Sequence, residues 1–151
     1  MIERSTLNLK KILFVEDEPE IFELIEMSLT NVGGFETHGF INGKDALGQA
    51  LAIRPQLILL DVMMPGMDGT MVYNALREFE EFKDLPVVFL TAKVSSRNMK
   101  RFISLGAADV LTKPFDPMVL PDTLRAIWFN HIELKMTGSR DGAVSGTPEP
   151  H

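Results

Sequence analysis

The sequence predicts an α/β fold in which helices cover both faces of a parallel sheet. Short apolar runs alternate along the chain with longer amphipathic stretches, and this alternation is typical of repeated strand–helix units. Acidic, hydroxyl and ammonium side chains directly follow several of the apolar runs, where the carboxyl edge of such a sheet would lie. With 151 residues, of which 45% are hydrophobic, the chain is long enough for one such domain.

The first unit begins after a short N-terminal segment. Lys11–Glu16 is an apolar run that predicts a buried strand. The helix that follows begins at Pro19, a favoured first-turn residue, and ends near Asn31 before a pair of glycines. Phe35–Phe40 predicts a second strand that is more polar than the first.

The middle of the chain contains the most apolar strand. Gly43–Ile53 predicts the second helix, which ends before Pro55 because the residue preceding a proline avoids the helical conformation. Gln56–Leu60 is a continuous apolar run after its first residue, which is the pattern of a fully buried strand. Thr70–Glu80 predicts the third helix.

The remaining elements follow the same alternation. Pro86–Leu90 predicts the fourth strand, and Ser95–Leu105 predicts the fourth helix, which Gly106 terminates. Ala108–Leu111 predicts the fifth strand, and a fifth helix covers about Pro117–Leu134. The predicted domain therefore spans residues 10–134, after an N-terminal extension of residues 1–9. Residues 135–151 are rich in Gly, Ser and Pro without periodicity, a composition typical of a disordered tail.

Composition excludes several classes of function. The net charge is −6 with no basic cluster, which disfavours direct nucleic-acid binding. The chain has no cysteine, so disulfides and thiolate metal sites are excluded. No apolar stretch approaches the ~18 residues that span a bilayer, and the N-terminus lacks a signal peptide. We therefore expect a cytoplasmic protein without direct contact with membrane or nucleic acid.

Five polar side chains follow predicted strands at their carboxyl ends. They are Glu16, Asp17, Asp61, Thr91 and Lys113. Ligands bind at this edge of open α/β sheets. Carboxylates suit Mg²⁺, which is usually held by one or two of them with waters and phosphate oxygens, while a hydroxyl and an ammonium suit phosphoryl oxygens. The set predicts a site where a divalent metal and a phosphoryl group meet a carboxylate nucleophile.

Each of these residues also has an ordinary structural explanation. Glu16 and Asp17 can complement a helix dipole, and Asp61 can belong to a turn. Thr91 can cap a helix, and Lys113 can be a surface lysine. Their joint position at strand ends favours the functional interpretation.

With these residues assembled, the sequence resembles the response-regulator receiver domains of two-component signalling. Four segments carry the resemblance: Ile12–Pro19, Asp61–Gly69, Leu90–Lys93 and Gly106–Phe115. It covers roughly residues 10–130 and implies a flavodoxin-like (βα)₅ fold, doubly wound, with strand order 2-1-3-4-5.

The resemblance also implies the chemistry of the site. Asp61 would accept a phosphoryl group from a phosphohistidine on a histidine kinase or phosphotransfer protein. Asp17, Asp61 and the backbone carbonyl of Met63 would bind Mg²⁺, with Glu16 acting through water. A cis peptide bond between Lys113 and Pro114 is implied as well.

Further residues would contact the phosphoryl group or transmit its presence. Thr91, Lys113 and Ala92 would contact it, and Met63 and Lys93 would tune its hydrolysis. Thr91 and residue 110 would form the switch, but Val110 stands where the family usually carries Tyr or Phe. We therefore expect a small response beyond the fourth helix.

Ile21 and Phe22 on the first helix are the expected docking face for the phosphodonor. No output domain follows the predicted receiver, so we expect a stand-alone phosphoacceptor, monomer or weak dimer. It would catalyse only its own phosphorylation and dephosphorylation and would signal by binding a downstream protein that the sequence does not name.

Three alternatives remain open at this point. The chain can be a receiver fragment of a larger regulator, a flavodoxin-like cofactor binder, or a metal-dependent phosphatase with an aspartate nucleophile. The acidic loop Glu16–Glu18 disfavours the cofactor binder, because it repels a phosphate unless a metal intervenes. Met63 disfavours the phosphatase, because such enzymes usually place a second acid two residues after the nucleophile.

Overall fold

The computed structural model describes residues 8–92 and 95–137, which form one parallel five-stranded sheet with helices on both faces. The strands pair in the order β2-β1-β3-β4-β5. Their bounds are β1 Lys11–Val15, β2 Glu36–Phe40, β3 Leu57–Asp61, β4 Val87–Thr91 and β5 Asp109–Thr112. The predicted fold class and strand order are therefore confirmed.

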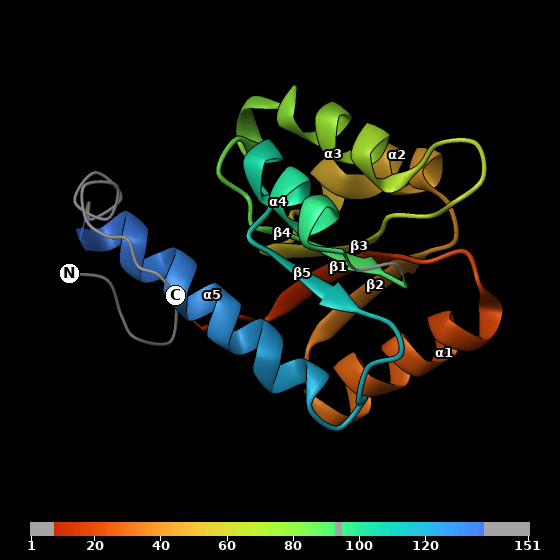
Figure 1. Cartoon of the computed structure of the whole chain (residues 1–151). Coiled ribbons are helices and arrows are strands. Elements are labelled where there is room, and N and C mark those ends of the chain that lie inside the picture. The colour runs from red at the N-terminus through yellow and green to blue at the C-terminus, as the bar shows by residue number, and fades with distance from the viewer. Residues whose placement is uncertain (1–7, 93–94, 138–151) are drawn as a thin grey trace.

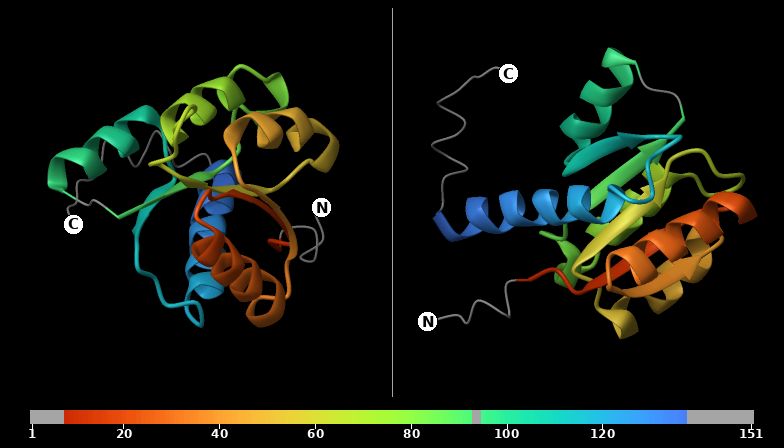
Figure 2. Two further views of the ribbon diagram at one scale, coloured as in Figure 1. Left: turned by 90° about the vertical axis from the view of Figure 1, so that its right-hand side faces the viewer. Right: turned by 90° about the horizontal axis from the view of Figure 1, so that it is seen from below.

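The helices lie in two layers, as the end-on view in Figure 2 shows. Helices α1 and α5 cover one face of the sheet, and α2, α3 and α4 cover the other (Figures 1 and 2). Their bounds are α1 Pro19–Met27, α2 Gly43–Ile53, α3 Gly69–Arg77, α4 Ser96–Leu105 and α5 Leu120–Thr137. A π-helical turn, Ser28–Val32, extends α1, and a 3₁₀ turn, Glu80–Phe82, follows α3.

The core is split by the sheet because successive strand residues point to opposite faces. Leu13, Ile58 and Phe89 belong to the layer that packs against α2, α3 and α4. Phe14 and Leu59 belong to the layer that packs against α1 and α5. All residues of β3 and β4 are buried, which explains why these two strands have the strongest sequence signal.

Three helix boundaries differ from the sequence prediction, each for a local reason. The first helix changes from α to π geometry at Ser28, whose hydroxyl donates to the Pro117 carbonyl near the start of α5. The last helix begins at Leu120 rather than Pro117, because a turn around Asp116 precedes it. The third helix ends at Arg77 before the 3₁₀ turn.

Helix α5 is longer than predicted. It continues to Thr137, three residues into the segment expected to be a tail, and residues 138–151 lie outside the described part of the chain. Its buried Trp128 belongs to the α1-side core layer and lies beside His131, with ring centroids 6.0 Å apart. Figure 1 shows the C-terminal turns of α5 projecting beyond the strands.

Two further expectations concern the backbone and the membrane. The peptide bond between Lys113 and Pro114 is cis, which confirms the prediction. Across residues 8–92 and 95–137, none of the helices combines the length and the apolar character that crossing a bilayer requires.

Candidate functional site

The acidic residues predicted from the sequence meet at the carboxyl edge of the sheet. Glu16 and Asp17 follow β1, and Asp61 is the last residue of β3. One oxygen from each of the three carboxylates lies within 4.8 Å of the others. Glu16 and Asp61 are buried, with 0% and 1% of their surface exposed. The central parallel strands therefore place separate acids in one small, largely dry space.

Lys113, which follows β5, supplies the positive charge of this cluster. Its Nζ atom is 2.9 Å from Glu16 Oε1, 3.3 Å from Asp61 Oδ1 and 3.6 Å from Glu18 Oε1. One ammonium thus faces two buried carboxylates and one exposed one. Since like charges in a buried site repel strongly, the cluster has too little positive charge from the described part of the chain to balance its carboxylates.

The hydrogen bonding and the chemistry of the carboxylate oxygens indicate that a cation fits this site. Glu16 Oε1, Asp17 Oδ1 and Asp61 Oδ2 are buried atoms without a hydrogen bond from the described residues, although the first forms the ion pair with Lys113. Buried polar atoms are nearly always satisfied, so such a group calls for a partner. Hard oxygen donors of this kind suit a divalent ion such as Mg²⁺.

The electrostatics of Asp61 agree with this shortage. Burial, followed by the neighbouring Glu16 carboxylate, raises the pKa of Asp61 to about 7 against the opposing effect of Lys113. Burial alone would lower the pKa of Lys113, but its contacts with Glu16 and Asp61 raise it above its ordinary value. The ammonium therefore stays charged, while Asp61 needs a further cation to be fully ionised at neutral pH.

Of the remaining predicted contact residues, Met63 contacts Asp61 directly, and Thr91 lines the same groove as Met63. The backbone N–H of Met63 donates to Asp61 Oδ1 at 3.2 Å, and the Met63 side chain is 59% exposed. Thr91 ends β4 and is buried, and Ala92 beside it is exposed. Lys93, expected to tune hydrolysis, lies outside the described residues.

Val110, at the predicted switch position, is smaller than the aromatic side chains that pack nearby. Val110 is buried on β5 and pairs in register with Phe89 of β4. The ring of Phe89 lies 4.9 Å from that of Phe102 on α4 and 5.7 Å from that of Tyr73 on α3, centroid to centroid. Aromatic packing next to β4 is therefore directed toward α3 and α4.

The predicted docking residues lie at the edge of the core. Ile21 and Phe22 are half-buried, and the Phe22 ring packs 4.8 Å from that of Phe14. Gly39 on β2 permits this contact, since a Cβ atom there would lie 2.7 Å from Phe22 and 2.4 Å from Phe14. Phe22 thus has a packing role, and its role in docking remains a prediction.

A groove of about 510 Å³ opens beside the acidic cluster, between the β3–α3 loop and α4. Met63 and Thr91 line its inner side, and Asn98, Arg101 and Phe102 line its helical side. The sequence interpretation missed Arg101 and Asn98. Their only signal was their position on the fourth helix, which does not reveal the side of the helix that faces the site.

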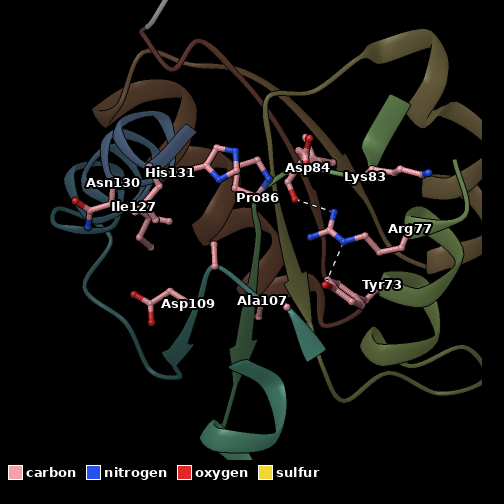
Figure 3. A pocket seen from close by; sticks show the side chains of 14 residues that line it. Tyr73, Arg77, Lys83, Asp84, Pro86, Ala107, Asp109, Ile127, Asn130 and His131 are labelled. Atoms are coloured by element: carbon pink, nitrogen blue, oxygen red, sulfur yellow. Dashed lines mark hydrogen bonds between the residues drawn. The ribbon is translucent and has the colours of Figure 1, made fainter. Parts of the chain in front are cut away.

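A second hollow, of about 430 Å³, lies at the opposite edge of the sheet (Figure 3). There Arg77 donates from Nη1 to the carbonyls of Phe82 and Leu85, at 2.7 and 2.8 Å, and from Nε to the Tyr73 hydroxyl at 3.1 Å. The Tyr73 hydroxyl in turn donates to the Leu105 carbonyl at 2.8 Å. This hollow is separate from the acidic cluster. The hydrogen bonds of Arg77 and Tyr73 along it connect α3 to the end of α4.

Comparison with known proteins gives one consistent result. The family model described as the response regulator receiver domain matches residues 12–125. The transcriptional regulatory protein PcoR of Escherichia coli is 42% identical over 108 residues, 72% of this chain and 46% of PcoR. The phosphate regulon transcriptional regulatory protein PhoB of Pseudomonas aeruginosa is 36% identical over 132 residues, 87% of this chain and 55% of PhoB.

The structural comparison agrees. The chemotaxis protein CheY4 of Vibrio cholerae superposes with a TM-score of 0.74 and 31% identity, covering 79% of this chain and 98% of CheY4. The present chain therefore matches nearly all of the solved CheY4 chain. It spans about half the length of the curated relatives that it matches.

Proposed function

The chain belongs to the family of response regulator receiver domains of two-component signalling, and we propose that it accepts a phosphoryl group on Asp61. The observation that carries this proposal is the environment of that carboxylate. Asp61 is buried, its Oδ2 atom has no hydrogen bond from the described residues, and Lys113 and two further acids surround it. A nucleophile for phosphoryl transfer needs this combination of an available oxygen and nearby cationic charge.

The transfer itself requires mainly positioning and charge neutralisation. An oxygen of Asp61 forms a bond to phosphorus while the bond from phosphorus to the donor nitrogen or oxygen breaks, and the leaving group takes that electron pair. The Lys113 ammonium reduces the repulsion between carboxylate and phosphoryl oxygens. The Thr91 hydroxyl and the Ala92 backbone N–H donate hydrogen bonds to the transferred group.

Asp17, Asp61 and the Met63 backbone carbonyl would hold Mg²⁺, with Glu16 acting through water. When bound, the ion supplies charge that neutralises the carboxylates and the phosphoryl oxygens together. The buried oxygens of Asp17 and Asp61 that receive no hydrogen bond from the described residues support this assignment. The protein would catalyse only its own phosphorylation and dephosphorylation.

The partners proposed are a histidine kinase or phosphotransfer protein upstream and a protein target downstream. Ile21 and Phe22 on α1 are the proposed contact for the phosphodonor. Direct contact with nucleic acid is not proposed for this domain, since the chain is acidic and lacks a basic cluster apart from the cations of α4.

A second candidate is the receiver part of a longer transcriptional regulator. One observation favours it: the curated relatives named above are transcriptional regulatory proteins, and the chain spans about half of each. In that case the output would belong to a segment beyond the matched region. The chemistry at Asp61 is the same in both candidates.

Phosphorylation is tested by incubating the protein with Mg²⁺ and acetyl phosphate and recording the intact mass. We expect a single phosphate adduct that is absent from Asp61→Asn. The matched control is Asp109→Asn, which changes an aspartate of β5 outside the acidic cluster and should retain the adduct. An adduct that persists in Asp61→Asn rejects the proposal.

The upstream partner is tested separately by phosphotransfer profiling against the histidine kinases of the source cell. We expect rapid transfer from a small subset of these kinases and none to Asp61→Asn. Equal, slow transfer from all of them would argue against a dedicated kinase.

A further inference from the structure

Helix α4 is the one strongly basic helix in the described part of an otherwise acidic chain. It carries Arg97, Lys100 and Arg101 and no acidic residue, while the whole chain has a net charge of −6. By contrast, α1 carries Glu20, Glu23 and Glu26 and no basic residue. The positive and negative charges are therefore concentrated on different helices. Residues of this basic helix line the groove that contains Met63 and Thr91, so its charges influence what enters there.

The three cations of α4 are not equivalent. Arg101 lines the groove that opens beside Thr91 and Met63, whereas Arg97 and Lys100 do not line it. The Arg101 guanidinium lies 5.3 Å from the centroid of the Phe102 ring, a cation–π contact that restrains its position. Among residues 8–92 and 95–137, no carboxylate lies within salt-bridge distance of Arg101.

The charge of Arg101 acts across this groove. The pKa of Asp68, on the opposite wall, is lowered first by the Met71 backbone N–H and the Thr70 hydroxyl, and also by the charge of Arg101. The groove thus carries a cation at its helical side and the acidic cluster beyond it. An anion that approaches Asp61 along the α4 side of the groove passes the Arg101 cation before it reaches the acidic cluster, while Asp68 on the other wall disfavours the opposite side.

We propose that Arg101 is a specificity-determining residue that attracts and orients small acyl phosphates in the groove between α4 and the β3–α3 loop. This proposal rests on phosphorylation of Asp61. In the reaction, Asp61 forms a bond to the phosphorus of the acyl phosphate while the bond from phosphorus to the acyl oxygen breaks, and the carboxylate leaves with that electron pair. Arg101 interacts with the anionic donor and takes no part in bond changes.

The test compares two donors that differ in charge. At neutral pH acetyl phosphate carries more negative charge than phosphoramidate, so it gains more from a nearby cation. We expect Arg101→Gln to lower the second-order rate of Asp61 labelling by acetyl phosphate about fivefold. The rate with phosphoramidate should fall only about twofold, because the attraction is roughly proportional to the donor charge.

Matched variants separate this role from general effects. Arg101→Lys keeps the charge and should retain most of the acetyl phosphate rate. Arg97→Gln and Lys100→Gln remove the same charge from the same helix outside the groove, and each should change that rate by less than about twofold. Raising the ionic strength should reduce the difference between wild type and Arg101→Gln.

The outcomes separate the inference from the function on which it rests. If wild type is labelled on Asp61 and Arg101→Gln matches Arg97→Gln with both donors, the role of Arg101 is rejected while the phosphoacceptor stands. An equal loss with both donors also rejects it, since that pattern reflects a disturbed fold. If wild type carries no label on Asp61, phosphorylation itself is rejected.

Discussion

Asp61 has to be buried and also ionised in order to react, and these two requirements conflict in the protein without a bound metal ion. Its burial prepares the carboxylate for reaction in a site with little water, but burial and the adjacent Glu16 also raise its pKa to about 7. Among residues 8–92 and 95–137, Lys113 is the one ammonium in contact with Asp61, and it is shared with Glu16 and Glu18. Such a site gives up stability for reactivity, as functional sites commonly do.

This conflict predicts how stability depends on pH without metal. The folded-state pKa of Asp61 lies above the ordinary aspartate value of ~3.9, so its contribution is most favourable below about pH 4 and is lost as the pH rises toward 7. In the presence of a chelator, Asp61→Asn should raise the free energy of unfolding at pH 8 by roughly 2 kcal/mol, measured by urea denaturation.

The gain should be smaller at pH 5 and should shrink when Mg²⁺ stabilises the wild type. Asp84→Asn removes an exposed carboxylate and serves as the control. An equal gain in both variants would contradict the explanation.

Met63 predicts the lifetime of the phosphorylated form. Hydrolysis needs a water held in line with the bond between Asp61 and phosphorus, and the exposed thioether of Met63 beside Asp61 is at best a weak hydrogen-bond acceptor. Dephosphorylation should therefore be slow and should accelerate several-fold in Met63→Asn, followed by loss of the mass adduct. Met71→Asn, an exposed methionine on α3, should not accelerate it, and an unchanged rate in Met63→Asn would count against this argument.

At the scale of elements, α3 and α4 are joined by a chain of hydrogen bonds rather than by apolar contact alone. Arg77 orients the Tyr73 hydroxyl, and that hydroxyl binds the Leu105 carbonyl at the end of α4. Gly106 follows with φ of +116°, and a Cβ atom there would lie 2.3 Å from the Tyr73 oxygen. Glycine at this position therefore serves both the helix terminus and the hydroxyl contact.

Tyr73→Phe removes only the hydroxyl and tests this link. It should lower the free energy of unfolding by about 1 kcal/mol, the usual net value of one hydrogen bond. Hydrogen exchange at the amides of Gly106 and Ala107 should become faster, because the end of α4 loses an anchor. Ser104→Ala, at an exposed position on the same helix, should leave both quantities unchanged. Unaltered exchange in Tyr73→Phe would show that ring packing alone holds α4.

The sequence predicted the elements well where burial dominates. Residues 57–60 and 87–90 are apolar on both faces, so the two central strands were recognised almost to the residue. The π-helical turn at Ser28 and the start of α5 at Leu120 were not predictable, because they depend on contacts between distant segments such as that between Ser28 and Pro117.

The same distinction holds at the site. Glu16, Asp17 and Asp61 were predictable as a group because parallel strands end at one edge. Tyr73 and Arg101 were not, since their roles depend on the spacing between helices and on the side of a helix that faces the groove. Spacing along the chain carries no such information.

At the scale of the whole molecule, the sheet separates two layers that need not respond equally to phosphorylation. Thr91 lies next to the groove under α4, and Phe89, Phe102 and Tyr73 form aromatic contacts toward α4 and α3. The switch position on β5 holds Val110, which belongs to this same core layer rather than to the layer that packs against α5, and it is buried and β-branched with few rotamers. A ligand biases a conformation only through differences in its interactions.

We therefore expect a beryllofluoride phosphoryl mimic to change amide chemical shifts mainly near Met99 and Phe102 of α4. Changes on β5 around Val110 and along α5 should be small. Val110→Tyr should extend the changes toward α5 if the missing ring limits the response. Large changes across α5 in the wild type would show that the ring is dispensable here.

Trp128 gives this arrangement an optical consequence. It is the single tryptophan of the chain, and it is buried on α5 near Leu9, which precedes β1 at the edge of the sheet opposite the acidic cluster. Its emission therefore reports the docking of α5 and not the occupancy of the site. Adding Mg²⁺ should leave the fluorescence spectrum unchanged, whereas denaturation should shift it to the red, so this chain carries a built-in reporter of unfolding that is silent to metal.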